Sequence, residues 1–300
     1  MPQMQGHHVQ QGLLSTRTMV IEKLTPRLAR TMFLIFGALL SAASLPLPAE
    51  AQMGGFGRKG MGGGTEAPAD TVEKRDHAIT ATGFTADFPS GFECEPVASP
   101  FGSPYRYDGS KRRDDRNSGL HGGMDLSLKE GTPLLAVAAG EVIARGEGGR
   151  LEGIFLWLRH APADTGLPYW IFSKYQHLAT PPEFTEGTRV QVGQIVALSG
   201  ATGTAGGHYG AAGYPHLHLS TFYGPSKEYT ARGMYNSMLQ GKGAVPDDPL
   251  ILYLREVSDL ALVRGFSAEN KKIGVAVVGE DGNVHPAGSK TVWPVHCKEN

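Results

Sequence analysis

The stretch His121-Gly-Gly-Met-Asp125-Leu-Ser-Leu128 shows most clearly how this chain folds. From Met124 onward, apolar side chains alternate with more polar ones, which is the period of a β-strand with one apolar face. Residues of equal parity on a strand share a face, so His121 and Asp125 are expected on the side opposite the apolar row. The stretch therefore predicts a strand that presents an imidazole and a carboxylate on the polar face of a sheet.

A second alternating stretch, Tyr214-Pro-His216-Leu-His218-Leu-Ser220, has the same character. Its two leucines are predicted to face the core, which turns His216 and His218 together to the other face. A third element, Tyr175-Gln-His177-Leu178, ends a predicted strand with a histidine at a polar position. Because histidine titrates near neutral pH, His177 is a further candidate for proton transfer.

These residue types suit a catalytic zinc ion, which takes three protein ligands and leaves a fourth position for water. His121, Asp125, His216 and His218 offer four donors for three positions, so one histidine of the pair remains for acid–base work. Structural zinc sites use cysteine more often, and neither cysteine lies near these motifs. Each motif alone occurs by chance in many chains, so the prediction depends on all three occurring in order beside Gly-rich turns.

The rest of the chain predicts a mainly β protein with an antiparallel sheet core. It contains 41 Gly and 20 Pro, and short apolar stretches alternate with turn residues. Strands are predicted over residues 134–139, 141–144, 154–158, 189–192, 194–198 and 216–219. Residues 226–265 are mixed, and 248–257 favour a helix over a strand. Residues 273–278 predict a closing strand, followed by a turn at Asp281-Gly282.

The N-terminal region has the order of a secretory signal peptide. Basic residues precede the apolar run 32–40, and small residues then lead to Ala49-Glu50-Ala51. The apolar run is too short to span a bilayer comfortably, so we expect cleavage after Ala51 and no transmembrane domain in the mature form; an uncleaved anchor is the alternative. In an exported protein, the two cysteines, Cys94 and Cys297, are expected to form a disulfide. The formal net charge of −1 gives no indication of nucleic acid or an anionic membrane as partner.

Residues from about Ser99 to Tyr223 resemble peptidase family M23, the zinc endopeptidases of the lysostaphin and LytM type. The resemblance covers under half of the chain, but several elements match in order. They are Ser99-Pro-Phe-Gly, His121-Gly-Gly-Met-Asp125, residues 131–142, Tyr175-Gln-His-Leu, residues 187–197, residues 200–203 and His216-Leu-His218.

The resemblance implies roles for five residues. By position, His121, Asp125 and His218 would bind zinc, and His177 and His216 would be catalytic beside the metal. The chain departs from the family pattern in a longer loop before the last motif and in a tail of about 75 residues, and both could reshape the substrate groove. His160 also matches a family histidine, which we interpret as supporting a strand end rather than catalysis. His208 is interpreted as a loop residue.

The residues and the resemblance together imply a domain organisation, and the resemblance implies a function. We expect a signal peptide over 1–51, a flexible Gly-rich linker over 52–87, a metallopeptidase domain with loops walling a zinc groove over 88–225, and a mixed extension packed on it over 226–300. The implied activity is zinc-dependent hydrolysis of peptidoglycan peptide cross-links in the periplasm or cell envelope. D-Ala–diaminopimelate and glycine cross-bridges both remain open as the bond that is cut.

Two other functions remain open. One is a non-catalytic module of the same fold that binds peptidoglycan or activates an amidase. Such relatives usually lack one or more metal ligands, whereas this chain keeps all of them. The other is a peptidase that acts on proteins such as Gly-rich ones.

Overall fold

The computed structural model describes residues 79–114, 117–149, 151–204, 214–232, 238–255, 257 and 259–300. The predicted signal peptide, its cleavage site, most of the predicted linker and His208 lie outside these residues. Within the described ranges, the chain forms no helix with the length and apolar character needed to cross a membrane.

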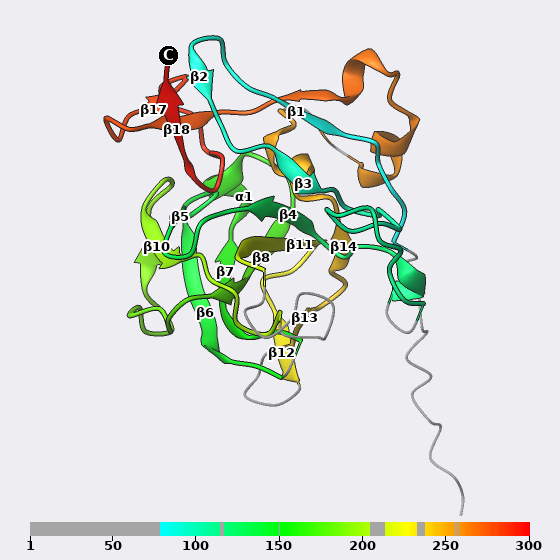
Figure 1. Ribbon diagram of the computed structural model, residues 1–300, viewed down its shortest axis with the longest axis vertical. Coiled ribbons are helices and arrows are strands. Elements are labelled where there is room, and N and C mark those ends of the chain that lie inside the picture. Colours follow the sequence, from blue (N-terminus) through cyan, green and yellow to red (C-terminus); the bar gives the residue numbers. More distant parts are fainter. Residues whose placement is uncertain are drawn as a thin grey trace, which may run out of the picture. The chain divides into compact units, whose positions relative to one another are not determined.

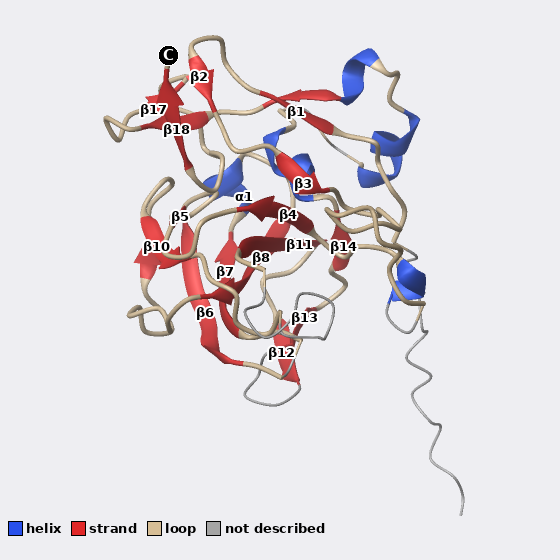
Figure 2. Cartoon of the chain, in the orientation of Figure 1, coloured by secondary structure: helices blue, strands red, loops and turns tan. Residues whose placement is uncertain are grey.

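One eight-stranded sheet dominates the structure (Figures 1 and 2). Its strands run in the order β3-β4-β11-β8-β7-β6-β9, with β14 also paired to β11. Every pairing in it is antiparallel, so the predicted mainly β, antiparallel fold class is confirmed. The strands are β3 (Val97–Ser99), β4 (Met124–Ser127), β6 (Gly140–Glu147), β7 (Ile154–His160), β8 (Trp170–Leu178), β9 (Arg189–Val190), β11 (His216–Gly224) and β14 (Val245–Asp247).

The alternation seen in the sequence sets the two faces of this sheet. Met124, Leu126, Leu217 and Leu219 are buried in the main core, as their spacing predicts. Tyr175 on the neighbouring strand β8 is buried in the same core and donates its hydroxyl to the carbonyl of Leu135, 3.0 Å away. The apolar side chains of β4, β8 and β11 therefore fix which face is left for the polar residues.

Shorter strand pairs surround the large sheet. β5 (Pro133–Leu135) pairs with β10 (Ile195–Leu198), and β12 (Tyr229–Arg232) pairs with β13 (Met238–Gly241). β1 (Thr85–Asp87) runs parallel to β15 (Lys272–Gly274). The described helices are short: η1 (Asn117–Gly119), α1 (Pro162–Thr165), η3 (Pro249–Tyr253), η4 (Leu260–Gly265) and η5 (Glu269–Lys271).

A separate four-stranded sheet joins residues from both ends of the described chain. Its order is β17-β16-β18-β2, and the strands are β17 (Val284–His285), β16 (Val277–Gly279), β18 (His296–Glu299) and β2 (Phe92–Glu93). Cys297 of β18 forms a disulfide with Cys94, the residue after β2, across a sequence separation of 203 residues and with their Cα atoms 4.5 Å apart. The predicted disulfide pairing is confirmed.

Two segments of the extension differ from the sequence prediction. The favoured helix over 248–257 is a short 3-10 helix, η3, which Asp248 caps by accepting a hydrogen bond from the Leu250 amide at 2.9 Å. The single closing strand predicted over 273–278 is two strands, β15 and β16. The strand is interrupted because the Val275 amide donates to Asp87 whereas the carbonyl of Ala276 accepts from Trp293, so consecutive residues pair with different partners.

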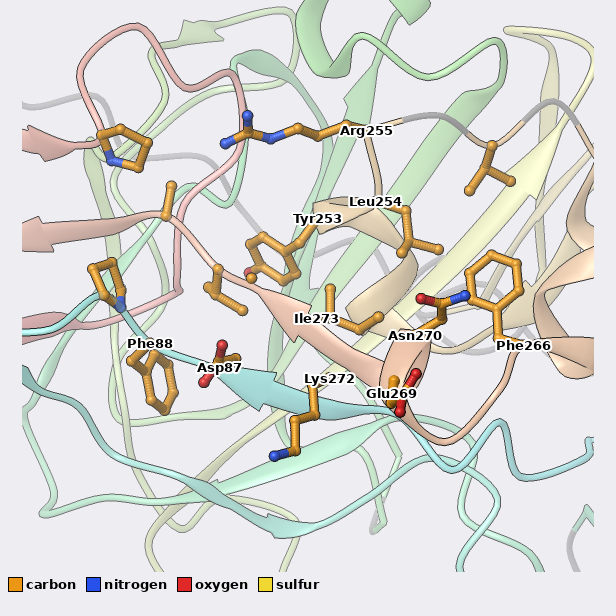
Figure 3. A pocket seen from close by; sticks show the side chains of 16 residues that line it. Asp87, Phe88, Tyr253, Leu254, Arg255, Phe266, Glu269, Asn270, Lys272 and Ile273 are labelled. Carbon is orange, nitrogen blue, oxygen red and sulfur yellow. The ribbon is translucent and has the colours of Figure 1, made fainter.

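A cavity of about 750 Å³ lies between the β1–β15 pair and the helices of the extension (Figure 3). Aromatic and aliphatic side chains line it together with both acidic and basic ones, among them Phe88, Tyr253, Phe266, Lys272 and Glu269. None of the five predicted site residues lines this cavity.

Candidate active site

The register of two neighbouring strands brings two of the three predicted metal ligands together. In the antiparallel pair of β4 and β11, Asp125 lies directly opposite His218. Directly opposite residues on one face of such a pair have Cβ atoms about 4.5–5.5 Å apart, so the side chains meet. His121 precedes β4 and is fixed by its backbone, because its amide donates to Ser103 at 3.1 Å and its carbonyl accepts from Gly102 at 2.8 Å.

Three donor atoms converge at this point. Asp125 Oδ1 lies 2.8 Å from His218 Nδ1 and 3.2 Å from His121 Nε2. The two ring nitrogens are 3.1 Å apart. A tetrahedral zinc ion with bonds of about 2.0–2.1 Å would separate its ligand atoms by about 3.4 Å, which is close to these distances. Two imidazole nitrogens and one carboxylate oxygen also form the donor set of a catalytic zinc site, so the residues fit this metal.

Hydrogen bonds on the far sides of the rings favour a cation at the centre. His121 Nδ1 lies 3.1 Å from the Pro100 carbonyl, which only accepts, so Nδ1 carries the proton and Nε2 presents its lone pair. His218 Nε2 lies 2.9 Å from Ser220 Oγ, and a proton there would leave the Nδ1 lone pair facing Asp125. In that tautomer, three electron pairs face one another and a metal ion would satisfy all of them.

The carboxylate of Asp125 is held ionised by its neighbours. Before a metal ion binds, burial opposes ionisation, but the charges of His121 and His218 and the hydrogen bonds that their rings donate outweigh it and hold the pKa of Asp125 well below its usual range. A bound metal ion would take the place of those protons. Its second oxygen, Oδ2, lies 3.4 Å from Arg112 Nη2. Sequence reasoning missed Arg112, because it stands in a run of basic residues that resembles an ordinary charged surface.

His177 and His216 lie beside this cluster, and each has its Nδ1 atom next to a backbone carbonyl. The Nδ1 atom of His177 is 2.7 Å from the Thr202 carbonyl, and that of His216 is 2.7 Å from the Tyr214 carbonyl. Each ring therefore donates from Nδ1 and keeps Nε2 as an acceptor. The ring centroids are 4.6 Å apart, and His216 Nε2 lies 3.8 Å from Asp125 Oδ1.

The backbone of His177 is unusual. It has a φ of 63°, in the left-handed region that non-glycine residues seldom adopt and that often occurs at functional sites. Burial, followed by the charges of His216 and His218, lowers the pKa of His177 to about 3, so its ring is neutral at pH 7. All five residues singled out from the sequence thus lie in one cluster.

The other described histidines have different surroundings. His160 is fully buried and bridges the Ala139 carbonyl, 2.7 Å from Nδ1, and Ser173 Oγ, 2.8 Å from Nε2. Burial lowers its pKa to about 4. These contacts agree with the interpretation that His160 supports the end of a strand and takes no part in catalysis. His285 joins Asp281 and Glu299 in a second group with ligand-type atoms within 4.8 Å, but both carboxylates are exposed there.

Part of this chain is similar to known proteins. A sequence model of Peptidase family M23 matches residues 119–228. Among solved structures, the catalytic domain of lysostaphin from Staphylococcus simulans is 25% identical, covering 43% of this chain and 81% of that one, with a TM-score of 0.31. LytU is 24% identical over 52% of this chain and 86% of that one, with a TM-score of 0.33.

A zinc-containing peptidase from Vibrio cholerae is 23% identical over 49% of this chain and 37% of that one, with a TM-score of 0.32.

Proposed function

We propose that this chain, whose residues 119–228 match the model of Peptidase family M23, is a zinc-dependent endopeptidase that hydrolyses peptide cross-links of bacterial peptidoglycan. The observation that carries the proposal is the convergence of three metal-type donor atoms, with the rings of His216 and His177 beside them. A binding module would have no need for this complete set.

In this proposal His121, Asp125 and His218 would hold the zinc ion. A bound zinc ion would supply Lewis acidity, polarising the scissile carbonyl and activating a water molecule. His121 and Asp125 are buried and His218 is partly buried, and the hydrogen bonds of His121 to Pro100 and of His218 to Ser220 fix how the two rings are oriented. The ligand positions are therefore prepared before the ion binds.

His177 and His216 would handle the proton. Because a backbone carbonyl holds the Nδ1 proton of each ring, only Nε2 is free to accept a proton from water. The same atom, once protonated, could donate to the amine that leaves when the peptide bond breaks, or could stabilise the negative oxygen of the attacked carbonyl. Burial lowers the pKa of both rings, so they are neutral at pH 7 and Nε2 of each carries a lone pair.

The proposed substrate is the peptide stem of peptidoglycan, which requires export to the periplasm or cell envelope. Two features of this chain support export: the signal-peptide order of the N-terminal residues and the Cys94–Cys297 disulfide, a bond typical of oxidising compartments. Sequencing the N-terminus of the exported protein is expected to give Gln52. A mature protein that retains the apolar run 32–40 would show an anchor instead.

Digestion of purified sacculi tests the activity. The protein with zinc is expected to release soluble muropeptides, a chelator to stop the release, and added zinc to restore it. If the zinc-loaded protein binds sacculi but releases nothing, the chain is the non-catalytic or amidase-activating module. In that case, adding an amidase would show whether it is an activator.

A further inference from the structure

We propose that the hairpin of residues 103–112 is a positioning element that supports the site at two points. Arg112 holds the carboxylate of Asp125, and Tyr107 holds the ring of His216 through Tyr214. The inference rests on the roles proposed above for Asp125 and His216. The hairpin lies before the segment that matches the family, residues 119–228.

The hairpin is tied together by its own backbone. Tyr105 and Lys111 form an antiparallel bridge. The Arg106 amide donates to Ser110 at 2.9 Å, and the Arg112 amide donates to Pro104 at 2.8 Å. The Arg106 side chain adds a bond to the Lys111 carbonyl at 2.8 Å. A segment closed in this way can hold its side chains in defined positions.

The first support is an ion pair at the carboxylate. Arg112 Nη2 lies 3.4 Å from Asp125 Oδ2 and donates to Ser99 Oγ at 2.9 Å. The opposite oxygen, Oδ1, is the one that faces His121 and His218. Arg112 therefore turns the carboxylate so that a single oxygen points at the metal position. Without this contact, the carboxylate could rotate and the ligand set would lose its order.

The second support is a stack of three rings. Tyr107 lies flat on Tyr214, with ring centroids 3.8 Å apart and planes 13° from parallel. Tyr214 lies in turn on His216, at 4.8 Å and 18°. The Tyr214 hydroxyl is hydrogen bonded to Ser127 Oγ on β4. The stack fixes the plane of the His216 ring, and with it the direction of Nε2.

The two supports predict two different losses. Arg112 contacts a proposed metal ligand, so its removal should weaken zinc binding. Tyr107 acts on a residue that does not bind the metal in this proposal, so its removal should slow turnover and leave zinc binding intact. A hairpin that merely stabilised the fold would not separate the two measurements.

Chelator competition tests the first support without any substrate. Arg112→Met, which removes the donors, is expected to weaken zinc binding about 10- to 100-fold, the usual loss when the hydrogen-bond partner of a ligand is removed. Arg112→Lys should recover part of the affinity. Lys111→Met is the matched control, because this exposed neighbour makes no contact with Asp125 in the structure. Zinc binding by folded Arg112→Met that equals or exceeds the wild type would overturn the assignment.

Steady-state kinetics and NMR test the second support. Tyr107→Leu is expected to lower kcat about 3- to 10-fold with KM and zinc affinity unchanged, whereas Tyr107→Phe keeps the stack and the activity. The His216 ring proton shifts should move in the Leu variant only. A raised KM with unchanged kcat would mean that Tyr107 binds substrate instead. Unmoved His216 shifts would also refute the stack as its support.

These readouts separate failure of the inference from failure of the proposed function. If the wild-type protein with zinc cleaves no peptidoglycan, the proposed endopeptidase is wrong. Chelator competition and the His216 shifts would still decide whether the hairpin positions Asp125 and His216.

Discussion

The eight-stranded sheet and the four-stranded sheet are built by different means. In the first, β8 and β11 each have nine residues, and alternate side chains face the main core on one side. The other face is polar at the histidine cluster and apolar around Phe172 and Phe222. In the second, β2 and β17 have two residues each, and β2 pairs with β18 from the far end of the chain. The eight-stranded sheet forms because the alternating apolar side chains of its strands pack in the core. The four-stranded sheet is held by contacts between distant segments and by the Cys94–Cys297 disulfide.

This difference predicts that the two regions respond differently to mutation. Changes on the polar face of the large sheet should alter metal binding and chemistry with little effect on stability. Changes in the four-stranded sheet should alter stability with little effect on the activity of each folded molecule. The predictions below test this separation, from the largest expected effect to the smallest.

The largest effect is expected at the metal ligands. Asp125→Ala and His218→Ala each leave two protein ligands, so both variants should lose zinc and all measurable turnover. Metal content per purified molecule and release of muropeptides measure the two losses. Asp164→Ala is a matched control, because this aspartate is paired with Arg189 at 2.7 Å and does not belong to the cluster. Zinc retained at full occupancy in either ligand variant would contradict the assignment.

A smaller loss is expected at the proton-handling histidines. His177→Ala and His216→Ala should keep zinc while turnover falls on the order of 10²–10⁴-fold, the usual contribution of general acid–base or oxyanion groups. The same two measurements distinguish this outcome from loss of a ligand. If His216→Ala lost zinc and His218→Ala kept it, the roles within the His216–His218 pair would be reversed.

In the four-stranded sheet, removal of the disulfide should act on stability alone. For a loop closed across 203 residues, a chain-entropy treatment gives a loss of about 5 kcal/mol in the free energy of unfolding. Urea denaturation of the Cys94→Ser/Cys297→Ser protein measures this loss, and reduced wild type is its control. Turnover per folded molecule should not change. An unchanged unfolding free energy would show that the sheet holds both ends without the covalent link.

The smallest effect concerns His160 and pH. Burial lowers its pKa from 6.5 to about 4, so between these values the unfolded chain binds a proton that the folded protein does not. Stability from this residue is therefore present above pH 6.5 and is lost as the pH falls toward 4, by about 3 kcal/mol at most.

His160→Asn removes this titration and can still donate to the Ala139 carbonyl. The difference in unfolding free energy between wild type and variant should shrink from pH 7.5 to pH 4.5, as measured by urea denaturation. A difference that stays constant would mean that His160 takes up its proton equally in the folded and unfolded states.

The sequence was informative where structure follows from local alternation. Parity along each strand placed Asp125 and His218 on the polar side, and the leucines next to them in the core. Pairing of the only two cysteines was likewise predictable once export was inferred.

Other features depend on contacts between distant segments and leave no local signal. Arg112 contacts Asp125 from a run of charged residues, and Tyr107 reaches Tyr214 from a separate hairpin. The φ of 63° at His177 also escaped prediction, because no glycine marks the position. The break in the predicted strand 273–278 arises from its two different partners, Asp87 and Trp293.

The most direct test of the proposed function is mass spectrometry of a purified cross-linked muropeptide dimer incubated with the full, zinc-loaded protein. Hydrolysis of the cross-link predicts two monomers whose masses add up to the mass of the dimer plus one water, with the break inside the peptide. Dimers that stay intact at full zinc occupancy would contradict the endopeptidase. So would products split between glycan and peptide, because that cleavage is the reaction of an amidase.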